Sequence, residues 1–71
     1  MKNHVRRYRF EAGDMTQQEL AHKVGVTRQT ILSIEKGRFK PSVELGLRLA
    51  RVLGTSVEQL FELEAEKEKH L

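Results

Sequence analysis

Apolar residues recur every three or four positions along most of this chain, which is the spacing of amphipathic helices. The pattern is clearest over residues 16–36, TQQELAHKVGVTRQTILSIEK. Thr16 and Glu19 have the spacing of a capping box at the start of one helix, and Gly25 supplies the left-handed residue that ends it. Thr27 is a suitable cap for the next helix. The segment is therefore predicted to form two short helices joined by a tight turn.

A further helix is predicted before this pair, over residues 4–11. Asn3 is its expected cap, and Gly13 follows as the residue that ends it. The spacing of apolar residues identifies the side chains expected to face inward, which are Val5, Tyr8 and Ala12.

Two more helices are predicted after the pair. The fourth runs from its cap at Ser42 to Leu53, and a short fifth helix runs from a capping box of Thr55 and Glu58 to Phe61. The stripe of the fourth helix that is expected to face the core consists of Val43, Gly46, Leu47, Leu49, Ala50 and Leu53.

The second helix of the pair has chemistry that suits a nucleic acid. Ile31 and Ile34 form its buried stripe, and the opposite face carries an amide, a hydroxyl and a methyl-rich side chain. A glutamine can bond adenine through two hydrogen bonds, an arginine can do the same with guanine, and a leucine can cover a thymine methyl group. Two helices joined by a short glycine-containing turn also form a helix-turn-helix, a DNA-reading unit.

Charge is distributed unevenly along the chain. The first 40 residues contain nine Lys and Arg against four Asp and Glu, whereas residues 41–71 contain four against six. The two halves therefore carry +5 and −2, which add to the net charge of +3. A basic half that includes the helix-turn-helix is what a surface facing phosphates requires.

Composition excludes several other classes of function. The 71 residues allow one small domain, predicted over residues 1–64 and followed by a polar tail over 65–71 that is expected to fray. There is no cysteine, so a disulfide framework and a thiolate metal site are excluded. The three histidines lack metal-ligand spacing, and no catalytic constellation is recognisable. We expect no enzyme activity, cofactor, metal, small-molecule ligand or membrane span, and a cytoplasmic location.

The motifs together resemble a known family. TQQELA at 16–21, VGVTRQTI at 24–31, IEKG at 34–37 and the dipeptide at 41–42 are similar to the lambda-repressor-like helix-turn-helix domains of Cro, C1 and Xre-type regulators. The resemblance covers about residues 3–61. It implies an all-α bundle of five helices, with a small antiparallel ribbon pairing the first residues with roughly residues 62–64. It also implies an ion pair between Arg9 and Glu35, and phosphate contacts by Gln17 and Gln18.

The complete set of expected DNA-binding residues combines the reading face with its basic surroundings. Arg28, Gln29 and Ser33 are expected to read base edges, and Thr30 and Leu32 to contribute. The set consists of Gln17, Gln18, Thr27, Arg28, Gln29, Thr30, Leu32, Ser33, Lys36, Arg38 and Lys40.

A homodimer is expected because one helix-turn-helix covers few base pairs, and two copies related by a two-fold axis would read a palindrome. Leu45 and Val52 lie off the core stripe of the fourth helix, and such an additional apolar surface indicates a partner. The interface is expected to consist of Leu45, Val52, Val57, Phe61 and Leu63.

The expected function is regulation of transcription, as a repressor that occupies its operator. Two alternatives share the fold: the antitoxin of a toxin–antitoxin pair, and the controller protein of a restriction–modification system. Antitoxins of this fold usually add a toxin-wrapping segment, and only the short tail is available here, which favours the regulator.

Overall fold

Hydroxyl side chains begin four of the five helices in the part of the chain that the structure describes, residues 1–63 of a computed structural model. Thr16, Thr27, Ser42 and Ser56 each accept a hydrogen bond from the backbone N–H three residues later. Such caps satisfy N–H groups that have no partner inside the helix. The helices are α1 (Val5–Glu11), α2 (Gln17–Val24), α3 (Arg28–Glu35), α4 (Val43–Val52) and α5 (Val57–Leu60).

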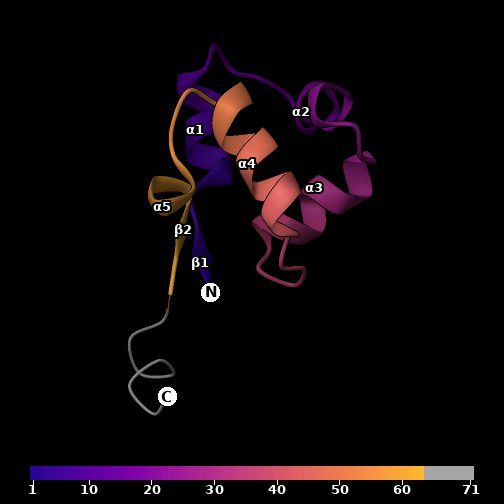
Figure 1. The fold of residues 1–71 in the computed structure, drawn as a ribbon. Coiled ribbons are helices and arrows are strands. Elements are labelled where there is room, and N and C mark those ends of the chain that lie inside the picture. Colours follow the sequence, from indigo (N-terminus) through magenta and orange to yellow (C-terminus); the bar gives the residue numbers. More distant parts are fainter. Residues whose placement is uncertain (64–71) are drawn as a thin grey trace.

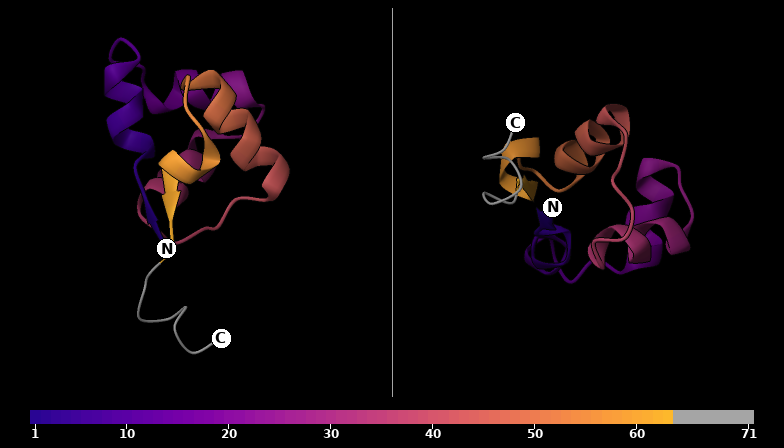
Figure 2. Two further views of the ribbon diagram at one scale, coloured as in Figure 1. Left: turned by 60° about the vertical axis from the view of Figure 1, so that its left-hand side comes forward. Right: turned by 90° about the horizontal axis from the view of Figure 1, so that it is seen from below.

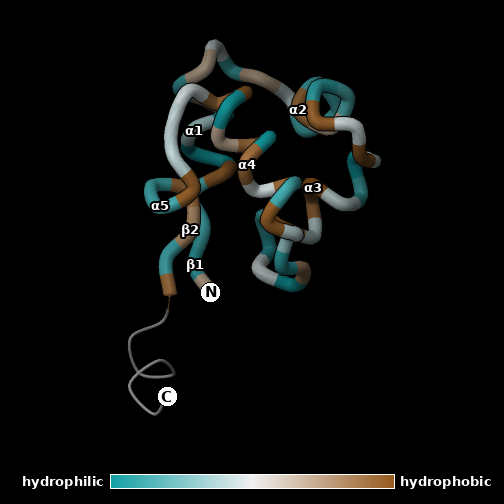
Figure 3. The backbone as a smooth tube through the Cα atoms, in the orientation of Figure 1, coloured by the Kyte–Doolittle hydropathy of each residue, from teal (hydrophilic) through white to brown (hydrophobic). Residues whose placement is uncertain are grey.

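The helix α4 occupies the middle of the molecule, between α5 on one side and the α2–α3 pair on the other (Figures 1 and 2). It packs against both α2 and α5, while α1 packs against α3. Hydrophobic and hydrophilic residues alternate along each helix (Figure 3), so each contributes one side to a shared core. The buried apolar residues are Val5, Leu20, Ala21, Val24, Ile31, Ile34, Leu45, Leu49, Ala50, Leu53 and Leu60.

A two-stranded antiparallel sheet joins the beginning of the chain to the end of the domain. Strand β1 (Lys2–Asn3) pairs with β2 (Phe61–Glu62), with Lys2 opposite Glu62 and Asn3 opposite Phe61. An ion pair between His4 and Glu62 lies beside this ribbon. The expected ribbon is confirmed, although its second strand begins one residue earlier than expected because α5 ends at Leu60. Residue 64 and the tail over 65–71 lie outside the described residues.

The core stripe predicted for α4 is partly wrong. Val43 and Leu47 are 81% and 56% exposed, whereas Leu45 is only 9% exposed and lies in the core. Leu49, Ala50 and Leu53 are buried as expected. The helix sequence, VELGLRLARV, has apolar residues on nearly every side. Periodicity alone therefore could not fix which side turns inward, and packing against α2 and α5 decided it.

Helix starts also differ from the prediction at two places. The helix α1 begins at Val5, and Asn3 reaches past His4 to accept the Val5 N–H at 3.3 Å. The helix α5 is capped by Ser56 rather than Thr55. The Thr55 N–H donates to the carbonyl of Ala50 at 2.9 Å, so Thr55 still belongs to the end of α4.

The inward face of α1 is also different. Val5 is buried and Tyr8 packs against the core, but Ala12 is exposed and lies just past the end of the helix. The second buried residue of α1 is a charged one, Arg9, which is 7% exposed. Periodicity of apolar residues does not detect a buried arginine, which needs a partner elsewhere in the fold.

We expect Glu19 to make the fold sensitive to acid. Its carboxylate accepts the Thr16 backbone N–H at 2.9 Å, and this bond is the main reason that the pKa of Glu19 lies below the ordinary 4.5. Because the folded pKa is the lower one, the ionised carboxylate stabilises the fold above pH 4.5, and this stabilisation is lost as the pH falls through the folded value. Glu19→Gln keeps an acceptor for the capping box but does not titrate.

The measurement is the melting temperature by circular dichroism over a series of pH values below 4.5. The melting temperature of Glu19→Gln should decrease less on acidification than that of the unmodified chain. Asp14→Asn is a matched control, because the Asp14 side chain has no hydrogen bond or ion pair within residues 1–63. Equal acid profiles for all three chains would contradict the assignment.

Candidate nucleic-acid interface

The turn between α2 and α3 is set by two backbone hydrogen bonds and one side-chain cap. Gly25 adopts the left-handed conformation, with a φ of 78°, and its N–H bonds the carbonyl of Ala21. The N–H of Val26 bonds the same carbonyl at 3.0 Å. The Thr27 hydroxyl then accepts the N–H of Thr30 and begins α3. The two helices pack against each other across this turn, so the predicted helix-turn-helix is confirmed.

The face of α3 that was expected to read DNA is accessible. Arg28 and Gln29 are exposed at the first turn, and Leu32 and Ser33 are half-buried beyond them. Neither Arg28 nor Gln29 has a side-chain hydrogen bond or ion pair within residues 1–63. The donors and acceptors at the start of α3 are therefore available to a ligand.

Threonine side chains at the start of α3 serve mainly the helix itself. The hydroxyls of Thr27 and Thr30 lie 3.1 Å apart and bond each other, and the Thr27 hydroxyl also caps the helix. Thr27 is exposed and Thr30 is half-buried.

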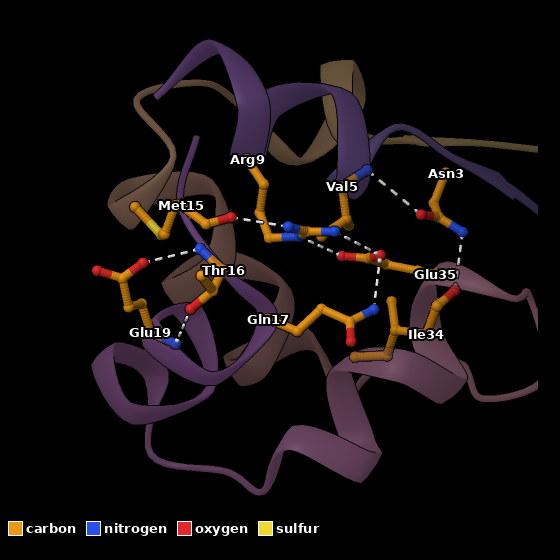
Figure 4. A network of polar contacts seen from close by, with 9 residues as sticks. All are labelled: Asn3, Val5, Arg9, Met15, Thr16, Gln17, Glu19, Ile34 and Glu35. Carbon is orange, nitrogen blue, oxygen red and sulfur yellow. Dashed lines mark hydrogen bonds and ion pairs between the residues drawn. The ribbon is translucent and has the colours of Figure 1, made fainter. Parts of the chain in front are cut away.

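Two glutamines at the start of α2 differ in their surroundings. Gln18 is exposed. Gln17 is half-buried, and its amide donates to the carboxylate of Glu35 at 3.1 Å (Figure 4). This contact fixes the Gln17 side chain between the two helices, and the sequence spacing gave no indication of it.

An ion pair joins α1 to α3, as the resemblance implied. Arg9 Nε donates to Glu35 Oε2 at 2.7 Å, and Arg9 Nη2 donates to Glu35 Oε1 at 3.1 Å (Figure 4). The two side chains are only 8% and 7% exposed. A third bond, from Arg9 Nη1 to the carbonyl of Met15 at 2.7 Å, reaches the residue before the α2 cap. One arginine thus connects α1, the entry to α2 and the end of α3.

The end of α3 leads into a basic loop. Gly37 has a φ of 75°, and its N–H bonds the carbonyl of Ile34, while the N–H of Arg38 bonds the carbonyl of Ser33. Lys36, Arg38 and Lys40 are all exposed here. Phe39, between two of these cations, is also exposed. It is absent from the set predicted from the sequence, and its exposure between two cations is an observation that the sequence pattern did not use.

The residues expected at a dimer interface do not form one surface. Leu45 is buried in the core, so its assignment to a surface is wrong. Val52 faces the end of α2, where it lines a hollow with His22 and Lys23. Val57 and Phe61 lie elsewhere, lining an apolar groove of about 200 Å³ that also contains Val43, Gly46 and Pro41. Leu63 is exposed just after β2.

Residues 1–63 lack two features that mark other classes of protein. No helix in this part of the chain is long and apolar enough to cross a membrane. The same residues contain no group of three or more His, Cys, Asp or Glu side chains placed to hold a metal ion.

Known proteins share this arrangement. A family model described as helix-turn-helix matches residues 6–60. The chain is 49% identical over 70 residues to an uncharacterised HTH-type transcriptional regulator of Methanothermobacter thermautotrophicus, covering 97% of this chain and 100% of the relative.

Solved structures agree in fold. The N-terminal DNA-binding domain of SinR from Bacillus subtilis matches with a TM-score of 0.73 and 33% identity, covering 84% of this chain and 87% of that one. The clp gene regulator ClgR from Corynebacterium glutamicum matches with a TM-score of 0.69 and 34% identity over 75% of this chain. The chain spans 55% of the ClgR chain.

Removing one partner of the Arg9–Glu35 pair should destabilise the fold strongly. An unpaired charge would then remain in a site where the side chains are less than a tenth exposed. We expect Arg9→Met or Glu35→Leu alone to lower the free energy of unfolding by about 3–5 kcal/mol. The double variant should lose much less than the sum, because no unpaired charge remains.

Urea unfolding of the unmodified chain, the two single variants and the double variant gives the free energies for this double-mutant cycle. Arg7→Met is a suitable control, because Arg7 pairs with Glu11 at an exposed site on the same helix. Single variants at Arg9 and Glu35 that unfold at the same urea concentration as the control would show that the pair is energetically a surface contact.

Proposed function

The chain belongs to the Cro/C1-type helix-turn-helix family of DNA-binding transcriptional regulators, and from this premise we propose that it is a repressor that binds a palindromic operator as a homodimer. Its binding unit is the domain of residues 1–64, acting on duplex DNA in the cytoplasm. Occupying the operator excludes polymerase. No cofactor takes part.

The observation that carries the proposal is the accessible start of α3. Arg28 and Gln29 have hydrogen-bonding groups with no partner inside residues 1–63, and they project from a helix whose other side is anchored by Ile31 and Ile34. A helix held in this way can enter the major groove with its first turn against base edges. Leu32 and Ser33 follow one turn later and extend the contact.

Backbone contacts surround this reading surface. The N-terminus of α2 offers free N–H groups to a phosphate, with Gln18 exposed beside it. On the other side, Lys36, Arg38 and Lys40 supply positive charge from the loop after α3. The contacts hold the domain at a fixed position on the duplex but do not distinguish sequences. Gln17 contributes chiefly by positioning, since its amide is bound to Glu35.

Dimer formation uses apolar residues on the outer side of α4 and α5, of which those on α4 are exposed and the other two are half-buried. We call this the α4–α5 surface, and it consists of Val43, Leu47, Val57 and Phe61. An exposed group of large apolar side chains on a small domain favours a protein partner. Leu63, beyond β2, would extend it.

The charges beside the α4–α5 surface favour a second copy as that partner. Arg51 and Glu58 line a hollow together with Val43, Leu47 and Val57. Neither charged side chain has an ion pair within residues 1–63. In a two-fold interface the same patch meets itself, so one positive and one negative group at its edge can pair across the axis. In Figure 2, α5 lies on the opposite side of α4 from α2 and α3. An interface formed on that side leaves the reading surface open.

Selection of bound duplexes from a random pool tests the proposal directly. The selected sites should contain an inverted repeat whose half-sites are about one helical turn apart, roughly 34 Å. Recovery of a single, asymmetric half-site would contradict the dimer. Failure to enrich any sequence would contradict sequence-specific regulation.

We expect Gln29→Ala to relax the base preference at one position in each half-site. A bidentate glutamine–adenine contact discriminates against the wrong base by about 1–3 kcal/mol. The selected operator and single-base variants of it, titrated by fluorescence anisotropy, measure this difference. Binding to random duplex should be nearly unchanged. Equal weakening on all sequences would identify Gln29 as a phosphate contact instead.

Arg38→Ala and Lys40→Ala should weaken binding to the operator and to random DNA alike. Each lost phosphate contact should reduce the slope of log K against log salt by about 0.9. The measurement is a salt titration of both duplexes. If both variants had the same salt slope as the unmodified chain, these residues would not be phosphate contacts.

Leu47→Glu should convert the dimer to a monomer without unfolding it, because Leu47 is already more than half exposed and not part of the core. Sedimentation at micromolar concentration compares the two states. His22→Glu introduces the same charge at an exposed position on α2 and should remain dimeric. A dimer of Leu47→Glu as stable as that of the unmodified chain would place the interface elsewhere.

A further inference from the structure

A groove of about 370 Å³ lies beside the reading surface, where α1, the start of α2 and the end of α3 meet. Its walls include Arg6 and Phe10 from α1, Gln17 from α2, and Leu32 and Lys36 from α3 and its end. Three of these residues, Gln17, Leu32 and Lys36, are also members of the expected DNA-binding set. The groove is therefore continuous with the reading surface and extends it onto α1.

The groove carries a net positive charge. Glu35 and Arg9 lie along it, but they neutralise each other through two hydrogen bonds. Arg6 and Lys36 are exposed, and neither has a carboxylate within ion-pair distance in residues 1–63. Two unneutralised cations thus face a groove whose internal charges already cancel.

An aromatic ring holds Arg6 in place without cancelling its charge. The Arg6 guanidinium carbon lies 5.5 Å from the centre of the Phe10 ring, and that of Arg9 lies 5.3 Å from the same centre. Both distances are within the range of a cation–π contact. A carboxylate partner would have fixed Arg6 equally well but would have removed its charge. The ring restricts the side chain and leaves its donors free for an anion.

The adjacent arginine shows the contrast. Arg7 pairs with Glu11 at 3.2 Å and lies over the ring of Tyr8 instead. It does not line the groove. The two neighbouring arginines are both exposed, yet only Arg6 combines a free charge with a position next to the reading surface.

We propose that this groove binds the sugar–phosphate backbone of duplex DNA next to the bases read by α3, and that Arg6 is a phosphate-contacting residue. Arg6 and Lys36 would lie on either side of a phosphate, and Phe10 and Leu32 supply apolar area for the adjoining deoxyribose. Charge complementarity and continuity with the reading surface identify the occupant as DNA backbone. The inference rests on the proposed function, because it takes the reading surface as the DNA-binding face.

The test compares Arg6→Ala with Arg7→Ala, two variants with the same change of charge at exposed positions of the same helix. Binding to the selected operator and to a random duplex is measured by fluorescence anisotropy over a series of salt concentrations. Arg6→Ala removes one contact from each protomer of the dimer, so the salt slope should fall by about 1.8, which corresponds to roughly 60-fold weaker binding at 0.1 M salt. The loss should be the same on both duplexes, and Arg7→Ala should bind nearly as the unmodified chain does.

Two further variants separate the effect of the Arg6 charge from the effect of the Phe10 ring that holds it. Arg6→Lys should restore most of the slope, because it keeps one positive charge at the site. Phe10→Leu should weaken binding less than Arg6→Ala does, with an unchanged slope, because the charge remains but is no longer held. Circular dichroism establishes that each variant is folded.

Equal losses in Arg6→Ala and Arg7→Ala would overturn the proposal, since they would reflect overall charge rather than a contact. Unchanged DNA binding by Arg6→Ala would also overturn it. If Arg38→Ala bound DNA more weakly in the same assay, the proposed function would remain intact. If the unmodified chain bound no duplex at all, the proposed function would fail together with this inference.

Discussion

One buried ion pair fixes how the helices of this fold are placed against each other. Arg9 and Glu35 are 26 positions apart in sequence, and their bidentate contact fixes α1 against the end of α3. Arg9 Nη1 donates to the carbonyl of Met15, and the Gln17 amide donates to Glu35 Oε1, which also accepts from Arg9 Nη2. The angle between α2 and α3 is therefore set by polar bonds as well as by the apolar core. Such bonds are directional, whereas hydrophobic packing alone would allow neighbouring arrangements.

This polar network lies next to the surface that reads DNA. Contacts to bases and phosphates require side chains placed within a fraction of an ångström, and rigid support from within the protein reduces the entropy lost on binding. The core of a 71-residue chain is small. Glu35 accepts hydrogen bonds from α1 and from α2 at once. These bonds make the site rigid where little apolar area is available.

Sequence alone was sufficient for features that depend on local chemistry. The Thr16, Thr27 and Ser42 caps and the left-handed Gly25 each follow from one residue and its neighbours. Sequence was insufficient where tertiary packing decides between near-equal local choices. Leu45 and Leu47 are both apolar residues of α4, and only contact with the other helices buries the first and exposes the second. The contacts of Gln17 with Glu35 and of Arg6 with Phe10 likewise depend on how helices meet or how side chains turn.

The short β1–β2 ribbon has a consequence for the topology of the chain. It places Lys2 opposite Glu62, so the two ends of the described domain leave from one place (Figure 1). Ends that lie together can be joined by a short peptide, and the chain can then be opened elsewhere. The turn at Gly13 and Asp14, which is exposed and lies away from the ribbon, is a natural opening point. A circular permutant cut there would carry α1 as its last helix while keeping the helix-turn-helix continuous.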